Sequence, residues 1–223
     1  MENELTITVN EAHRVSGLLN SPPNPTACYV LAHGAGAGMT HPFMAAVAAG
    51  LGDRGLATLR YQFPAMERGS RRPDAPALAH ATVRAAVATA LERLPGLPLI
   101  AGGKSFGGRM TSQTQAETPL PDVRGLAFLG FPLHPAGKPS DDRAQHLFDV
   151  RVPMLFLQGT RDTLADTSLL VPLIERLGDC ATLRLFEHAD HSFHVPARSG
   201  KSDRQVLEEL LDSLAAWATG LPA

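Results

Sequence analysis

The chain has 223 residues, of which 44% are hydrophobic, and this combination predicts one globular domain over residues 1–223 with a substantial core. Its 20 basic and 22 acidic side chains give a formal net charge of −2, which provides no electrostatic footprint for nucleic acid or for an anionic membrane. The start, Met1-Glu2-Asn3-Glu4, is acidic and polar rather than basic and then apolar, and no apolar run reaches the ~18 residues of a spanning helix. We therefore expect a soluble, cytoplasmic protein that binds a small molecule.

The chain opens with a predicted β-hairpin. Residues 5–9 alternate apolar and polar side chains, and residues 13–19 can return antiparallel after the turn at residues 10–12. After a proline-rich stretch, residues 27–32 are apolar throughout, as expected for a central strand that is covered on both faces.

Apolar strand segments then alternate with amphipathic helical segments. The further predicted strands are residues 56–61, 97–102, 123–129, 152–157 and 182–186, and the predicted helices are residues 42–54, 77–94, 107–117, 167–177 and 202–217. This alternation predicts an α/β fold with a mostly parallel sheet, helices on both faces and an N-terminal antiparallel hairpin. Residues 66–76 and 134–150 are rich in Gly and Pro, so we interpret them as loops and expect no large cap domain.

The two cysteines, Cys28 and Cys180, both lie in apolar segments typical of strands. Buried free thiols are the ordinary occupants of such segments, and nothing in the sequence demands an oxidising compartment. We therefore predict buried free thiols rather than a disulfide.

A short motif after the predicted strand at 97–102 points to chemistry. Gly103-Lys104-Ser105-Phe106-Gly107 has the G-x-S-x-G pattern of a nucleophile elbow, in which a sharp strand-to-helix turn exposes a serine. The small glycines let the strand and helix backbones approach closely. The pattern predicts Ser105 as a nucleophile if a base and an acid accompany it.

Both partners follow at predicted strand ends. Asp162 lies in the loop after an apolar strand and a glycine, and His191 lies beyond the last strand. The order Ser105, Asp162, His191 matches the α/β-hydrolase arrangement, in which the acid orients the base that activates the serine. One alternative remains open at this point. Asp162 could merely form a turn with Thr160, and Asp166 would then be the best substitute acid.

The developing oxyanion of such a reaction needs two preorganised donors. The backbone N–H of Phe106 follows the nucleophile at a helix start, and the glycine-rich segment of residues 33–38 offers the second donor, for which Ala35 is our prediction. The alternative is that residues 33–38 form only a flexible connection.

Two other ligand classes fit the sequence poorly. The glycine-rich segment lacks G-x-G-x-x-G spacing because Met39 occupies the last position, and Gly103-Lys104-Ser105 lacks the P-loop glycine because residue 98 is proline. His188, His191 and His194 have a three-residue spacing but no accompanying H-E-x-x-H or Cys cluster. We therefore predict no metal and no cofactor.

Four motifs occur in a characteristic order, namely His33-Gly34-Ala35-Gly36, Gly102-Gly103-Lys104-Ser105-Phe106-Gly107-Gly108-Arg109, Gly159-Thr160-Arg161-Asp162 and Asp190-His191-Ser192-Phe193. Together they resemble a small α/β-hydrolase related to dienelactone hydrolases, and the resemblance spans most of the chain. Residues 130–139 look more specifically like the testis-expressed-type hydrolase-like branch. The resemblance implies a compact core with Ser105 as nucleophile, Asp162 as acid and His191 as base. Dienelactone hydrolases use a cysteine nucleophile, so Ser105 departs from their pattern.

Four side chains are candidates for contact with substrate. Lys104 and Arg109 flank the nucleophile and favour an anionic acyl group, although a structural salt bridge also explains Arg109. His134 follows a predicted strand at the edge where ligands enter such sheets, and His33 is a further candidate that fits a role in positioning the oxyanion loop better.

The sequence thus predicts a serine hydrolase acting on an ester, thioester or related acyl bond of a small molecule. The rival from another class is an inactive protein that uses this fold for binding or as a scaffold. Acyl transfer and amide hydrolysis use the same groups and stay open. We expect no nucleic-acid or membrane partner, and either a monomer or a homodimer.

Overall fold

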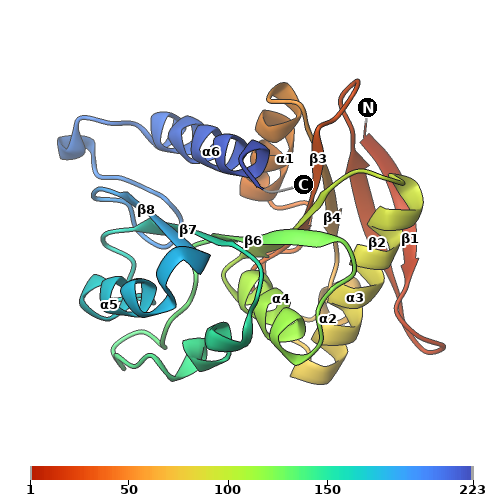
Figure 1. Ribbon diagram of the computed structural model, residues 1–223, viewed down its shortest axis with the longest axis horizontal. Coiled ribbons are helices and arrows are strands. Elements are labelled where there is room, and N and C mark those ends of the chain that lie inside the picture. Colours follow the sequence, from red (N-terminus) through yellow and green to blue (C-terminus); the bar gives the residue numbers. More distant parts are fainter. Residues whose placement is uncertain (1, 222–223) are drawn as a thin grey trace.

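The computed structural model describes residues 2–221, whose strands form one eight-stranded sheet in the order β1-β2-β4-β3-β5-β6-β7-β8 (Figure 1). The strands are β1 (Glu2–Thr8), β2 (Arg14–Asn20), β3 (Ala27–Ala32), β4 (Leu56–Tyr61), β5 (Leu99–Lys104), β6 (Val123–Leu129), β7 (Met154–Gly159) and β8 (Ala181–Phe186). The β1–β2 and β2–β4 pairs are antiparallel, and all other pairs are parallel. The predicted α/β fold with an opening hairpin is confirmed.

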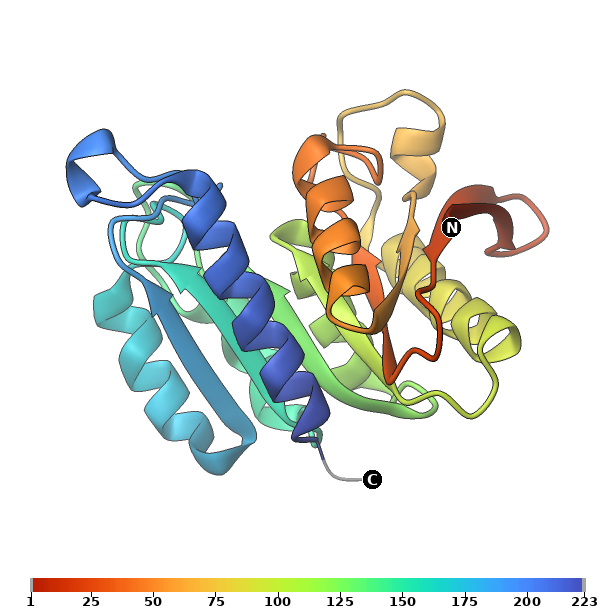
Figure 2. The same cartoon turned by 90° about the horizontal axis from the view of Figure 1, so that it is seen from above.

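Helices cover both faces of the sheet, as the view from above shows (Figure 2). They are α1 (Pro42–Asp53), α2 (Pro64–Glu67), α3 (Pro76–Arg93), α4 (Phe106–Glu117), α5 (Thr167–Leu177) and α6 (Asp203–Thr219). Met44 of α1 and Leu210 of α6 belong to one apolar core, while Val83 of α3, Met110 of α4 and Leu173 of α5 belong to the other. No cap domain is inserted within residues 2–221.

The two cores explain why the central strands are apolar throughout. Cys28 and Val30 of β3 pack into the core beneath α3 and α4, whereas Tyr29 and Leu31 pack into the core beneath α1 and α6. Successive side chains of a strand point to opposite faces, so a strand covered on both sides needs apolar residues at every position. The parallel strands thereby place their carboxyl ends along one edge of the sheet.

Some predicted boundaries and loops differ from the structure. Strands β5 and β7 begin two residues later than predicted, directly after Pro98 and Pro153. Proline has no backbone N–H to donate to a neighbouring strand, so it favours a position outside the sheet. The segment 66–76 begins within α2, where Pro64 supplies a favourable first helical residue. The segment 134–150 includes a 3-10 helix, η1 (Asp142–Asp149), that packs against α4.

The cysteine prediction is correct for Cys28, which is buried in β3, and wrong for the burial of Cys180. Cys180 is exposed because it lies in a short 3-10 turn, η2 (Gly178–Cys180), that precedes the edge strand β8. Both thiols are free. No helix in the described range 2–221 is long and apolar enough to cross a membrane.

Candidate active site

Ser105 lies in a strained turn between β5 and α4. Its backbone has φ 50° and ψ −117°, a conformation that non-glycine residues rarely adopt and that costs about 1–3 kcal/mol. A Cβ at Gly107 would lie 2.5 Å from the carbonyl oxygen of His33, so only glycine permits this close packing of α4 on β3. The Ser105 hydroxyl does not cap α4, and this leaves it available to another partner.

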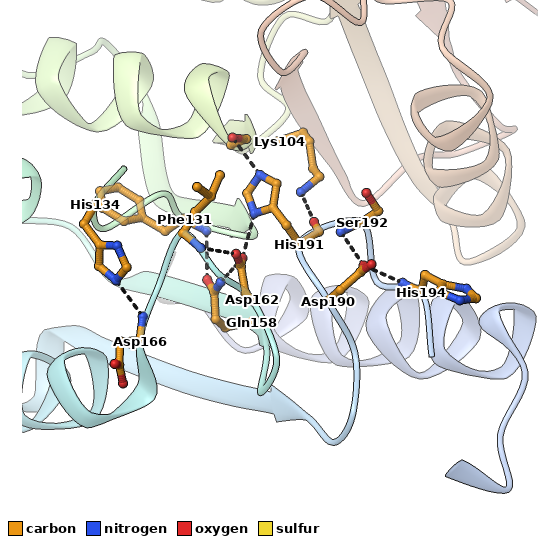
Figure 3. A network of polar contacts seen from close by, with 12 residues as sticks. Lys104, Phe131, His134, Gln158, Asp162, Asp166, Asp190, His191, Ser192 and His194 are labelled. Atoms are coloured by element: carbon orange, nitrogen blue, oxygen red, sulfur yellow. Dashed lines mark hydrogen bonds and ion pairs between the residues drawn. The ribbon is translucent and has the colours of Figure 1, made fainter. Parts of the chain in front are cut away.

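A continuous chain of hydrogen bonds links Ser105 to a carboxylate, and its part from His191 to Asp162 can be followed in Figure 3. The Ser105 Oγ lies 2.9 Å from Nε2 of His191, and Nδ1 of His191 lies 2.6 Å from Oδ2 of Asp162. The carboxylate accepts a hydrogen bond from Nδ1–H of His191, so the neutral ring has no proton on Nε2, which faces the hydroxyl. The structure brings together the three residues that the sequence placed in three separate loops.

The Asp162 carboxylate is fully buried and is held by several donors. Its Oδ1 accepts the backbone N–H of Leu164 at 2.8 Å, and its Oδ2 accepts the side-chain amide of Gln158 at 2.5 Å. The other end of that amide, Oε1 of Gln158, accepts the N–H of Phe131 at 2.9 Å. Sequence reasoning missed Gln158, although a glutamine in the otherwise apolar β7 was the available signal.

The substitute acid, Asp166, does not reach His191. Its carboxylate caps α5 by accepting the N–H and the hydroxyl of Ser168, and these hydrogen bonds lower its pKa. Asp162 does form a local turn, with its N–H bonded to Gly159, but the same side chain also orients His191. Asp162 therefore forms the turn through its backbone and contacts His191 through its side chain.

His33 fixes the peptide that precedes Ala35. Its Nδ1–H donates to the Gly34 carbonyl at 2.7 Å, and its Nε2 accepts the Phe63 N–H at 3.1 Å. Burial lowers the pKa of His33, which keeps the ring neutral as these two bonds require. A trans peptide points its N–H opposite to its C=O, so the Ala35 N–H is turned away from the His33 ring.

The other predicted oxyanion donor, Phe106, begins a helix. Phe106 is the first residue of α4, where helical geometry supplies no backbone acceptor for the N–H group. The Ala35 N–H likewise bonds no acceptor within the described part of the chain. Two free amides thus flank the turn that carries Ser105.

A cavity of about 400 Å³ opens beside Ser105. Apolar side chains form most of its wall, and polar groups lie near the hydroxyl; the lining residues are Gly34, Ala35, Ala37, His41, Phe43, Met44, Lys104, Ser105, Leu164, His191 and Ser192. Phe43 stacks on Phe193 with ring centroids 5.9 Å apart, and this pair stiffens one side of the cavity. Its size is within the range of small-molecule pockets.

Of the four predicted substrate contacts, Lys104 alone is among the residues that line this cavity. His33 is buried beneath the glycine-rich loop. His134 braces the loop after β7, because its Nε2 accepts the Asp166 N–H at 2.9 Å. The buried Nε of Arg109 has no hydrogen-bond partner among the described residues, and burial together with the charge of Arg143 lowers the pKa of Arg109.

The three closely spaced histidines do not converge. His194 pairs with Asp203 at 2.8 Å, and His188 lies near Glu187, whereas His191 faces Ser105. Within residues 2–221, no group of three or more His, Cys, Asp and Glu side chains is arranged to hold a metal ion.

A second Ser–His contact lies further along α4. Ser112 Oγ is 2.7 Å from Nε2 of His146 in η1, and the same hydroxyl donates to the Arg109 carbonyl. Burial is the main cause that lowers the pKa of His146 to about 4, and the charges of Arg109 and His80 add to it. No carboxylate is hydrogen-bonded to His146 within the described chain.

Solved structures of similar fold include three hydrolases. A lid-free α/β serine hydrolase from Xanthomonas campestris has 20% sequence identity and a TM-score of 0.75, with 100% of this chain and 96% of that chain covered. A dienelactone hydrolase from Anabaena variabilis has 22% identity and a TM-score of 0.77, with 100% and 99% covered. An esterase from Pyrococcus furiosus has 15% identity and a TM-score of 0.78, with 100% and 92% covered.

Identities at this level establish a shared fold only, so family membership depends on the sequence match. Residues 25–219 match the family model described as an α/β hydrolase domain, and this range includes the whole hydrogen-bonded chain from Ser105 to Asp162. The resemblance to α/β-hydrolases is thereby confirmed over most of the sequence, and the chain belongs to the α/β hydrolase family.

Proposed function

We propose that this α/β hydrolase is a serine esterase or thioesterase that cleaves an acyl bond of a small substrate. The observation that carries the proposal is the unbroken contact from Ser105 Oγ through His191 to Asp162, with the serine in a strained elbow. A hydroxyl becomes a competent nucleophile when a neighbouring base accepts its proton.

In the proposed reaction, the Ser105 oxygen attacks the acyl carbon while Nε2 of His191 accepts the hydroxyl proton. The carbonyl oxygen becomes negatively charged, and the imidazolium is stabilised by Asp162. When the tetrahedral intermediate collapses, the bond to the leaving group breaks and His191 returns the proton to that group. Water, deprotonated by the same histidine, then attacks the acyl carbon of the acyl-enzyme. The bond to Ser105 Oγ breaks, His191 returns the proton to this oxygen, and the acid is released.

The N–H groups of Ala35 and Phe106 are the proposed oxyanion donors. Both amides lie beside Ser105 without a backbone acceptor, and the Ala35 peptide is held by His33 before the substrate arrives. Donors fixed in advance stabilise the developing charge without reorganisation, and each such donor contributes about 10²–10³ in rate.

The cavity favours a compact, apolar acyl or alkyl group. Its walls include Ala37, Phe43, Met44 and Leu164, and its volume of about 400 Å³ is small for an extended lipid chain. The similar structures that are described as esterases support hydrolysis as the reaction class. The serine nucleophile separates this site from the cysteine of dienelactone hydrolases.

A fluorophosphonate probe tests the catalytic proposal without knowledge of the substrate. We expect the wild-type protein to be labelled at Ser105 and the Ser105→Ala variant to stay unlabelled. A panel of p-nitrophenyl acetate, butyrate and palmitate, together with acyl thioesters, then tests the substrate class. We expect turnover of the short esters to exceed that of palmitate by at least about tenfold.

Equal labelling of wild type and Ser105→Ala would reject the enzymatic proposal in favour of an inactive binding protein. A clear preference for palmitate would retain the serine hydrolase but reject a small substrate. Ser112→Ala is the matched control, since this serine also contacts a histidine but lies inside α4.

A further inference from the structure

Lys104 precedes the proposed nucleophile, yet its side chain ends at the loop that carries the proposed base. Its Nζ donates a hydrogen bond to the backbone carbonyl of His191 (Figure 3). The same Nζ lies 5.4 Å from the centroid of the Phe193 ring, two residues further along this loop. One side chain thus connects the end of β5 with the segment between β8 and α6.

The ammonium is held in this place without a direct ion pair among the described residues. Burial lowers the pKa of Lys104 to about 8, and the charges of Asp162 and Asp190 oppose this effect. A buried charge without a paired partner is unfavourable, and an apolar side chain of similar length would avoid that penalty. The hydrogen bond to the His191 carbonyl, the Phe193 ring and the charges of Asp162 and Asp190 are the interactions that offset this penalty.

The neighbouring strand end makes room for this ammonium. Gly130, at the end of β6, has φ +73°, and a Cβ there would lie 2.9 Å from the Lys104 Nζ and 3.5 Å from the His191 ring. Glycine accepts both the left-handed backbone and the close approach. The local structure is thus adapted to keep Lys104 and His191 together.

We propose that Lys104 is a positioning residue that anchors the backbone of His191 and so holds its imidazole against Ser105. This inference rests on the proposed serine hydrolase function. Asp190 also organises the loop, by accepting the N–H groups of Ser192 and His194, but these bonds bypass His191 itself. Within residues 2–221, the bond from Lys104 is the one hydrogen bond made by the His191 backbone.

The anchor predicts a loss of reactivity at alkaline pH. The titratable groups that face Lys104 are Asp162 from the loop after β7, and Asp190 and His191 from the loop after β8. Above pH about 8 the ammonium loses its proton, and its bond to the carbonyl ceases to be charge-assisted. The anchor to the His191 carbonyl then weakens.

Fluorophosphonate labelling of Lys104→Met is the direct test, with the exposed Lys138→Met as the matched control. We expect the labelling rate at pH 7 to fall by about 10- to 100-fold in Lys104→Met, because a displacement of about 1 Å at a reacting group has effects of this size. For the best short ester, kcat should fall by the same factor while KM changes by less than about threefold. Lys138→Met should match the wild type.

The pH dependence of labelling provides a second test. The labelling rate of the wild type should decline by about two- to fivefold between pH 7.5 and pH 9.5, as a charge-assisted bond weakens. Lys104→Met, which lacks the titrating group, should show no such decline. Far-UV circular dichroism and the thermal midpoint verify that each protein is folded over this range.

The possible results separate the two proposals. If the wild type is labelled no faster than Ser105→Ala, the proposed function fails. If the wild type is labelled normally and folded Lys104→Met matches it, the function stands and the positioning role of Lys104 is rejected. A raised KM with unchanged kcat would also reject it, since Lys104 would then act by binding substrate.

Discussion

Two serines, one in the turn before α4 and one within α4, lie less than two helical turns of sequence apart, and each contacts a histidine at a nearly equal distance. Ser105 Oγ is 2.9 Å from His191, and Ser112 Oγ is 2.7 Å from His146. The shorter contact belongs to the pair that lacks every other feature of a reactive site. Distance alone therefore does not identify a nucleophile.

The surroundings distinguish the two pairs. His191 has a carboxylate on its far nitrogen and a cavity beside its serine, so charge on its ring is compensated and a substrate has space. His146 has no such carboxylate on its ring. Burial and the nearby positive charge of Arg109 lower the pKa of His146 to about 4. An imidazolium is disfavoured at His146, and Ser112 is committed to the Arg109 carbonyl within the helix. We infer that the second pair joins η1 to α4 and has a structural role.

Removal of each histidine should give the largest contrast. His191→Ala is expected to lower kcat/KM for a short ester by about 10³–10⁶-fold, because the serine loses its base. His146→Ala should retain activity within about threefold and lose about 1–3 kcal/mol of unfolding free energy, because a half-buried hydrogen bond and its packing are lost. Ester kinetics and urea unfolding measure the two effects. Comparable losses of activity in both variants, with the proteins folded, would contradict the distinction.

A comparison of Asp162 with Asp166 tests which carboxylate acts on the base. Asp162→Asn should lower kcat by about 10⁴-fold, since an amide favours the wrong tautomer of the base. Asp166→Asn should leave kcat unchanged, because asparagine caps a helix about as well as aspartate. Single-turnover acylation with a p-nitrophenyl ester measures the effect. A substantial loss in Asp166→Asn alone would make Asp166 the functional acid.

Gln158 donates a hydrogen bond to Asp162, the proposed acid, and the Ser112 pair has no counterpart to this contact. Gln158→Leu should lower kcat by about tenfold and the unfolding free energy by about 1–3 kcal/mol, because Asp162 loses a donor and the Phe131 N–H loses its acceptor. Both quantities are measured on the same preparation. If stability falls but kcat does not, Gln158 supports only the fold.

The smallest expected effect concerns acid stability. The pKa of His146 is lowered from 6.5 to about 4 in the folded protein, so between these values the unfolded chain binds more protons than the folded one. The stability associated with this group is present above pH 6.5 and is lost progressively as the pH falls toward 4.

Urea unfolding at pH 7 and pH 5 measures this dependence. The wild type should lose about 1–2 kcal/mol more than His146→Ala on going to the lower pH. Identical pH dependence in the two proteins would show that His146 is not kept neutral by the fold. Ser105→Ala is a suitable control, since it leaves η1 and His146 intact.

Much of the fold and of the candidate site follows from local sequence. The period of two in β1, the apolar run of β3 and the helical spacing of α5 are properties of short segments, so the structure confirms the predicted elements there. The starts of β5 and β7 shifted because prolines precede them, while β1 begins three residues before the predicted residue 5. The 3-10 helix η1 was not predicted because it is stabilised by its packing on α4. The order Ser105, Asp162, His191 was visible because each residue follows a recognisable strand end.

The amino-acid sequence by itself thus determined the order of elements, the elbow and the three residues of the proposed triad. Only the tertiary structure decided which further groups support them, namely Lys104, His134 and Gln158, and that Arg109 lies outside the cavity lining. The physical reason is distance along the chain. Lys104 reaches the carbonyl of a residue 87 positions away, and such a contact exists only after the parallel strands bring their carboxyl ends to one edge of the sheet.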